Sequence, residues 1–244
     1  MIKNFDISYD FEHYFLPNIW EDCEIPTTEK GAENQEGNIM SKQDKTLLFM
    51  TLAVTLTEKN EMPIVSPYTG DIPEDIMGIH RTNRVSNPKV APHFYFEDNR
   101  IYQYWNKPFE TEKLVSRFKC SISMDFSMTN EMGRPQKIYS SFLNKLWAAW
   151  LQSRGHAVIP NVSFPDEIQE DYWIEGWPKH SIIAVSSIGV LRHGSPKGWL
   201  DGLNRIKEEL QPLHIIRYGA KLPGENTTNC TYFTNDNNRS ANGR

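Results

Sequence analysis

Short hydrogen-bonding side chains follow several apolar runs of this sequence, at the points where the runs end. Asp98 follows HFYFE, Asp125 and Ser127 lie in SISMDFSM, and Asn161 follows HAVIP. Two carboxylates with hydroxyl and amide neighbours can hold a polar ligand, exchange a proton with it or bind Mg²⁺. These residue types predict a small-molecule or nucleotide site, provided that the fold brings them together.

The second half of the chain adds further candidates of the same kind. Ser163 comes two residues after Asn161, the pair Ser186 and Ser187 ends the run SIIAVSS, and Tyr218 ends LHIIRY. We expect Asp125 and Asp98 to be the catalytic groups. The expected ligand-binding residues are Ser127, Asn161, Ser163, Ser186, Ser187 and Tyr218.

Several of these residues also have a structural interpretation. Asp125 is suited to brace the loop that follows it, and Ser163 is suited to cap a helix. Ser186 and Ser187 precede Gly189, as expected of a tight turn. Neither serine lies in a GxSxG motif, and no nearby His and Asp pair supports a catalytic triad. The sequence leaves both interpretations open.

Metal and cofactor motifs are missing from the sequence. The three cysteines form no CxxC, and no histidine lies at ligand spacing from another histidine or a carboxylate on one helix. We therefore predict no metal site, with Mg²⁺ between Asp98 and Asp125 as the alternative. No GxGxxG follows a predicted strand and no GxxxxGK[ST] occurs, so the sequence identifies no cofactor.

Predicted strands and helices alternate along the chain, and they would position the candidate residues. Strands are expected to start near residues 93, 121, 157, 181 and 213, with a possible edge strand at 62–66. Helices are expected between them, including 136–154 and a helix between Ser163 and Gly176. Such crossover connections make neighbouring strands parallel.

The predicted fold class is α/β, with repeated strand–helix units and a mainly parallel sheet. We favour a partial or irregular (β/α) barrel, and an open doubly wound sheet is the alternative. Both architectures bind ligands beyond the carboxyl ends of their strands. The candidate residues all fall at such ends, which is why we expect one shared site.

Composition divides the chain into four predicted parts. Residues 1–20 form an aromatic N-terminal arm, and residues 21–45 form a flexible acidic linker. A single α/β domain spans 46–222, and a polar, disordered tail spans 223–244.

Charge and hydropathy narrow the classes of partner. Residues 1–44 carry ten acidic and three basic residues, whereas 45–244 carry 21 and 23. A nearly neutral body argues against nucleic acid as the partner. The most apolar run, at 46–56, is too short to span a bilayer, and the amino terminus does not resemble a signal peptide. We expect a cytoplasmic protein without membrane contact.

Six segments together resemble a known family. They are RTNRVSNPKVAPHF, HFYFEDNRIYQYWNKP, ISMDFSMTNEM, WLQSRGHAVIPNVSF, SIIAVSSIG and WLDGLNRIKEELQPLHIIRYG. In this order they resemble a family of domains of unknown function catalogued as four-four-one-seven, over roughly residues 78–223. Its members are typically encoded by bacterial phages, prophages and mobile elements. The resemblance implies a cytoplasmic, mobile-element-associated protein and implies no activity.

The chain departs from the family pattern at three places. Glu97 and Asp98 stand where the family tends to have two aspartates, and Ser186 and Ser187 stand where it tends to have Ser-Thr. These two changes keep the chemistry. Phe164 replaces a Trp, which would change the shape of a pocket if this ring lined it.

Three functions are compatible with the sequence. The first is a protein, possibly enzymatic, with a small-molecule or nucleotide pocket at the strand ends. The second is a non-catalytic protein that binds a host or phage partner through its amino-terminal arm and linker. The third and weakest is a nucleic-acid-binding factor, supported by basic residues in 136–154 and in HRTNR at 80–84.

Overall fold

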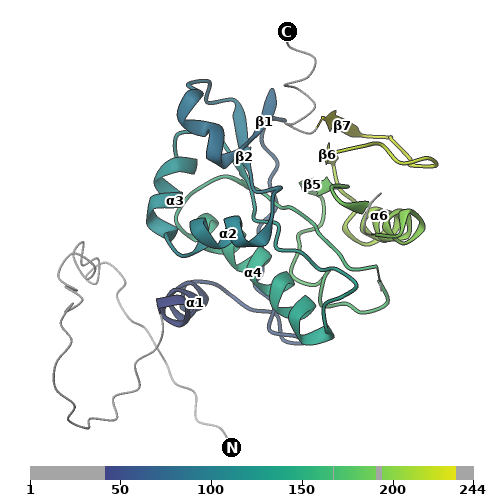
Figure 1. The fold of residues 1–244 in the computed structure, drawn as a ribbon, viewed down its shortest axis with the longest axis horizontal. Helices are drawn as coiled ribbons and strands as arrows, with labels where there is room; N and C mark the ends of the chain where they lie inside the picture. The colour runs from purple at the N-terminus through teal and green to yellow at the C-terminus, as the bar shows by residue number, and fades with distance from the viewer. Residues whose placement is uncertain (1–41, 167, 191–193, 235–244) are drawn as a thin grey trace, which may run out of the picture. The chain divides into compact units, whose positions relative to one another are not determined.

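Short parallel strands alternate with helices through the part of the chain that the computed structural model describes, residues 42–166, 168–190 and 194–234 (Figure 1). The strands are β1 Asp75–Gly78, β2 Val90–His93, β3 Ser121–Ile122, β4 Val158–Ile159, β5 Ile182–Ser186, β6 His214–Tyr218 and β7 Cys230–Phe233. The helices are α1 Lys42–Leu52, the 3₁₀ helix η2 Ile79–Arg84, α2 Asp98–Trp105, α3 Pro108–Val115, α4 Arg134–Ser153 and α6 Pro196–Leu210. The predicted arm, 1–20, and most of the predicted linker lie outside the described residues.

The strands follow one another in chain order. β1 pairs with β2, β3 with β4, and β5 with β6 and then β7, always in parallel. A parallel bridge between Asn161 and Ala184 connects the end of β4 to β5, and β2 contacts β3. The predicted α/β class with parallel sheets is therefore confirmed. Within the described ranges the three small sheets do not form a closed barrel.

Strands β2 to β6 are almost entirely buried on both faces, as the continuous apolar run of β5 indicates. In β5, Ile182 and Ala184 belong to one hydrophobic cluster, whereas Ile183 and Val185 belong to the other. The first cluster takes members from all seven described strands. The second packs the strands against helices, and its largest members on α4 include Trp147 and Trp150, both fully buried.

The helix expected between Ser163 and Gly176 is absent from the described residues there, which form turns. The prediction of this helix is wrong, and side chains bind carbonyl groups inside the segment that a helix would pair with backbone nitrogens. Trp173 Nε1 donates to the Ile168 carbonyl at 3.2 Å, and Arg205 Nη1 donates to the Glu170 carbonyl at 3.0 Å. Lys145 Nζ donates to the carbonyl oxygens of Tyr172 and Trp173 at 3.2 and 3.1 Å. Ser163 therefore caps no helix.

The expected disorder of residues 223–244 is wrong for β7. This strand pairs in parallel with β6, in a register that runs from Ile215 opposite Cys230 to Tyr218 opposite Phe233. Its four residues, Cys-Thr-Tyr-Phe, have high strand propensity, which outweighs the polar composition of the surrounding segment. Residues 235–244 lie outside the described part.

Two boundaries nearer the amino terminus also differ from expectation. The possible edge strand at 62–66 makes only one isolated antiparallel bridge, between Leu56 and Pro63. The predicted linker ends earlier than 45, since α1 begins at Lys42. The described residues belong to one compact unit.

A buried lysine holds the turn segment 171–177 against α4. Lys145 is fully buried, its Nζ lies 2.5 Å from Ser141 Oγ, and it stands 5.1 Å from the centre of the Trp177 ring. Burial lowers the pKa of Lys145 to about 7, because an ammonium ion is costly away from water; the nearby Glu175 opposes this shift.

Stability is therefore expected to rise with pH above neutrality. Between about pH 7 and the ordinary lysine pKa of 10.5, the unfolded chain keeps a proton that folded Lys145 has lost. The free energy of unfolding should then increase by at most about 1.4 kcal/mol per pH unit. Urea titrations at pH 7, 8 and 9 measure this slope. Lys145→Met should flatten it, and an unchanged slope in this variant would contradict the assignment.

Candidate functional site

The expected residues at the ends of β3 and β4 are joined by hydrogen bonds. Asn161 Nδ2 donates to Asp125 Oδ1 at 2.8 Å, and the Tyr95 hydroxyl donates to Asn161 Oδ1 at 3.0 Å. The Asn161 backbone nitrogen also donates a hydrogen bond, to Ser123 Oγ at 2.8 Å. The buried Asn161 thus has a fixed orientation and links Asp125 to the interior.

A second carboxylate is bound beside this chain of hydrogen bonds. Asp98 accepts a hydrogen bond from Ser127 Oγ at 2.9 Å and another from the Ser127 backbone nitrogen at 3.1 Å. Asp98 is the first residue of α2, where the helix dipole favours a negative charge. We call Tyr95, Asp98, Asp125, Ser127, Asn161 and Ser163 the strand-end cluster.

Asn144 on α4 fixes the backbone of this cluster, and sequence reasoning missed it. Its Oδ1 accepts from the backbone nitrogen of Phe126 at 2.7 Å, and its Nδ2 donates to the Phe126 carbonyl at 3.0 Å. The same Nδ2 donates to Ser163 Oγ at 3.0 Å. Asn144 is buried on the wide apolar face of α4, and a polar residue in that position was the available signal.

Asp125 has an altered acidity. The residue is partly exposed, but burial of its carboxyl group, together with the charge of Asp98, raises its pKa from 3.8 to about 6. Hydrogen bonds from Asn161 and Ser163 act in the opposite direction. A carboxyl group with this pKa exchanges protons near neutral pH, as a general acid or base must.

Tyr218 reaches the cluster through its ring and is buried. It stacks on Tyr95 with ring centres 4.7 Å apart at 17°, and the His93 ring lies 4.6 Å from it. Only 1% of Tyr218 is exposed, so its ring belongs to the buried aromatic group that Tyr95 connects to Asn161.

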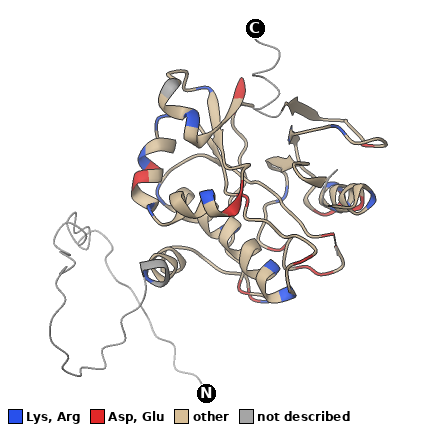
Figure 2. Cartoon of the chain, viewed as in Figure 1, with Lys and Arg blue, Asp and Glu red and all other residues tan. Residues whose placement is uncertain are grey.

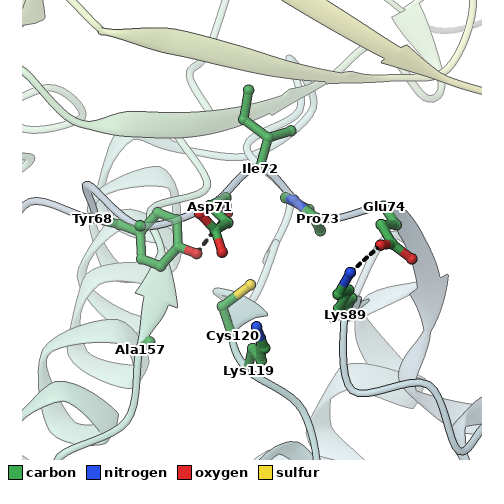
Figure 3. A pocket seen from close by; sticks show the side chains of 10 residues that line it. Tyr68, Asp71, Ile72, Pro73, Glu74, Lys89, Lys119, Cys120 and Ala157 are labelled. Atoms are coloured by element: carbon green, nitrogen blue, oxygen red, sulfur yellow. Dashed lines mark hydrogen bonds and ion pairs between the residues drawn. The ribbon is translucent and has the colours of Figure 1, made fainter.

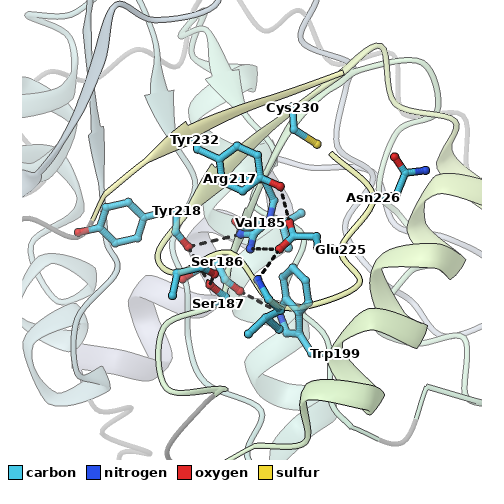
Figure 4. A network of polar contacts seen from close by, with 12 residues as sticks. Val185, Ser186, Ser187, Trp199, Arg217, Tyr218, Glu225, Asn226, Cys230 and Tyr232 are labelled. Carbon is cyan, nitrogen blue, oxygen red and sulfur yellow. Dashed lines mark hydrogen bonds and ion pairs between the residues drawn. The ribbon is translucent and has the colours of Figure 1, made fainter. Parts of the chain in front are cut away.

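Ser186 binds the turn that follows β5, and Ser187 binds the segment that follows β6 (Figure 4). Ser187 Oγ donates to the Ala220 carbonyl at 2.7 Å, and Ser186 Oγ accepts from the Ile188 nitrogen at 3.1 Å. The structural interpretation of both serines therefore accounts for their contacts. Their role as ligand-binding residues stays a prediction.

Phe164, the third departure from the expected family pattern, packs away from the carboxylates. Its ring centre lies 5.5 Å from that of Trp173 and 6.1 Å from that of Trp199. Gly202 on α6 admits this ring, because a Cβ there would lie 2.2 Å from Phe164 Cε2. The Phe164 side chain thus belongs to the packing of α6.

Within the described residues, no three His, Cys, Asp or Glu side chains are grouped as metal ligands. None of the helices described there is long and apolar enough to cross a membrane.

The model of a family described as "Domain of unknown function (DUF4417)" matches residues 57–234, somewhat beyond the expected limits. The chain belongs to the DUF4417 family. This confirms the resemblance found in the sequence.

Two curated proteins that are similar to this chain come from phages. The Gene 1 protein of Mycobacterium phage D29 is 25% identical over 130 residues, which are 53% of this chain and 48% of the relative. The Gene 1 protein of Mycobacterium phage L5 is 27% identical over 133 residues, covering 53% and 57% respectively. The aligned region therefore spans about half of each relative. No solved structure matches this chain.

Proposed function

We propose that this DUF4417 domain binds a small polar molecule at the strand-end cluster and that Asp125 exchanges a proton with it. The observation that carries the proposal is the partly exposed residue Asp125, whose carboxyl group has a pKa near 6, at the carboxyl end of parallel strands. Ligands of parallel α/β domains bind at this edge. Cytoplasmic location is part of the same proposal.

The cluster favours the hydroxyl or amino groups of a ligand over phosphate. Asp98 and Asp125 offer carboxylate oxygens, which accept hydrogen bonds and repel anions. Among the cluster residues, the partly exposed Ser127 and Ser163 add hydroxyl groups. A nucleoside base or a sugar supplies the donors that such a site recognises. If the ligand is a nucleotide, we expect its phosphate to point away from the two carboxylates.

Asp125→Asn should keep or raise stability while it removes the acid–base group. Folding raises the pKa of Asp125 from 3.8 to about 6, so the free energy of unfolding falls as the pH rises from 3.8 to about 6. Above this range the whole of the loss in stability remains. The neutral variant should be more stable at pH 7.5 by about 1–3 kcal/mol. Urea unfolding at pH 4 and 7.5 measures the difference, which should nearly vanish at pH 4. A large loss of stability would instead make Asp125 a structural brace.

Ligand binding provides the functional test. Thermal unfolding would be followed with adenosine, guanosine, cytidine, uridine, glucose and ribose as probes, at pH 5 and pH 7.5. We expect at least one probe to raise the melting temperature of the wild-type protein and to have no effect on Asp125→Asn. Asp201→Asn, which neutralises an exposed carboxylate of α6 outside the cluster, is the control and should respond as wild type. Equal responses of wild type and Asp125→Asn would contradict the proposal.

The other two functions receive less support. The arm and linker needed for partner capture lie outside the described residues, so this alternative rests on their composition. For nucleic acid, Figure 2 shows acidic and basic residues on the same elements. Lys107, just before α3, lies 3.3 Å from Glu110, and Lys197 lies 2.6 Å from Asp201 on α6. Such mixed charge favours neither a duplex nor a single strand as partner.

A further inference from the structure

A cleft of about 530 Å³ lies at the opposite ends of the strands from the strand-end cluster (Figure 3). Lys89 directly precedes β2, Cys120 precedes β3 and Ala157 precedes β4, and all three line the cleft. The segment 68–74, which leads into β1, forms the remaining wall. The cleft is therefore built from the amino-terminal ends of four neighbouring strands, and its volume suits a small molecule.

The walls of the cleft combine apolar surface with charges at the rim. The Tyr68 ring is held by a hydrogen bond from its hydroxyl to the Asp71 carbonyl at 2.7 Å. Ile72 is 40% exposed, which leaves its apolar side chain available to a ligand. Tyr68, Ile72 and Ala157 thus offer a partly apolar lining of the kind that holds a hydrocarbon or aromatic group.

Two of the four charged groups are already matched to each other. Lys89 Nζ lies 2.6 Å from Glu74 Oε1, so this pair is neutral as a unit. Asp71 and Lys119 form no ion pair with any residue of the described ranges. Both are exposed, and Figure 3 shows them on either side of the Cys120 thiol. The cleft therefore presents one available carboxylate and one available ammonium group.

We propose that this cleft binds a small zwitterion of the amino-acid type with an apolar side chain. Its carboxylate would pair with Lys119, its ammonium group with Asp71, and its side chain would cover Tyr68 and Ile72. A lone anion or cation would leave one of the two protein charges unmatched, so the neutral zwitterion fits the charges best. The site is independent of the strand-end cluster.

The test uses the full chain and two-dimensional NMR with L-leucine, L-methionine, L-phenylalanine and L-tryptophan as probes. We expect at least one to shift the amide resonances of Tyr68, Lys119 and Cys120 and to leave those of Asp125 and Asn161 unchanged. Phenylacetate and phenethylamine, which each lack one charge of phenylalanine, should bind about tenfold more weakly or worse than the amino acid that fits.

Variants of the two exposed rim charges complete the test. Asp71→Asn and Lys119→Gln should each weaken binding by about tenfold, whereas the exposed α3 variant Lys113→Gln should match wild type. Asp125→Asn should bind the amino acid normally. The amino-acid site is therefore tested independently of the function proposed for the strand-end cluster. The proposal is overturned if none of the four amino acids shifts the cleft resonances, or if phenylacetate or phenethylamine binds as tightly as they do.

Discussion

Replacing Glu225 by alanine is expected to lower the free energy of unfolding by about 3–5 kcal/mol, because it leaves a buried guanidinium group without its counter-ion. Arg217 on β6 and Glu225 before β7 are both fully buried in their side chains. Arg217 Nε lies 2.6 Å from Glu225 Oε1, and Arg217 Nη2 lies 3.3 Å from Oε2. The pair forms the centre of the network shown in Figure 4.

The rest of this network links the ion pair to neighbouring elements. Tyr232 of β7 donates its hydroxyl to Glu225 Oε1 at 2.9 Å, and Arg217 Nη1 donates to the Val185 carbonyl at 2.7 Å. The guanidinium group also lies 4.4 Å from the centre of the Trp199 ring on α6. One ion pair therefore ties β5, β6, β7 and α6 together.

Urea unfolding at pH 7 measures the effect, with two controls. Asp201→Ala breaks the exposed Lys197–Asp201 pair and should change stability by less than about 1 kcal/mol. The double variant Arg217→Met with Glu225→Leu removes both buried charges and should be more stable than Glu225→Ala alone. A double variant that is no more stable than Glu225→Ala would show that packing, and not the unpaired charge, sets the cost.

The network also predicts an acid-sensitive step in stability. Burial opposes ionisation of Glu225, but hydrogen bonds from Arg217, Leu222 and Tyr232 outweigh it and lower the pKa of this carboxyl below 4.5. The stability that the pair contributes is therefore present above pH 4.5 and is lost as pH falls through the lowered value. Glu225→Gln should show a smaller loss below pH 4.5 than wild type.

The placing of Asp125 and Asn161 at one edge of the sheet could be predicted from hydrophobic periodicity and from the ends of the predicted strands. The alternation of Ile122, Met124 and Phe126 with polar residues placed Asp125 beyond a short buried strand, and the run before Asn161 did the same. Parallel pairing of β3 with β4 then brings both residues to one edge. This inference needs only local patterns and the rule that crossover connections give parallel neighbours.

Contacts between residues far apart in the chain explain what the sequence did not show. Asn144 reaches Phe126 across 18 positions, and Lys145 reaches the carbonyls of Tyr172 and Trp173 across nearly 30. Neither contact leaves a local pattern, yet the first orders the site and the second holds the turn segment 171–177 against α4. Glu225 was likewise assigned to a polar tail, since its partner Arg217 lies in another element.

The second large effect is expected from Gly176→Ala, which should destabilise the protein by about 3–4 kcal/mol. Gly176 has φ +86°, a conformation that side chains rarely adopt, and a Cβ added there would lie 2.5 Å from the Pro63 carbonyl oxygen. Backbone atoms cannot yield as a flexible side chain would. The clash would also push the Lys145 side chain, whose Cδ lies 3.3 Å from the added carbon.

Gly155 supplies the matched control for Gly176, because it shares the backbone conformation and lacks the clash. Its φ is +85°, and nothing lies within 4 Å of an added Cβ. Gly155→Ala should therefore cost only the conformational strain, about 1–2 kcal/mol. Equal losses for the two variants, measured by urea unfolding at one pH, would mean that Pro63 moves aside. Segment 62–66 is fixed against the turn that α4 holds, through the 2.9 Å hydrogen bond from the Val65 nitrogen to the Gly176 carbonyl. A larger loss of stability for Gly176→Ala than for Gly155→Ala measures how firmly it is fixed.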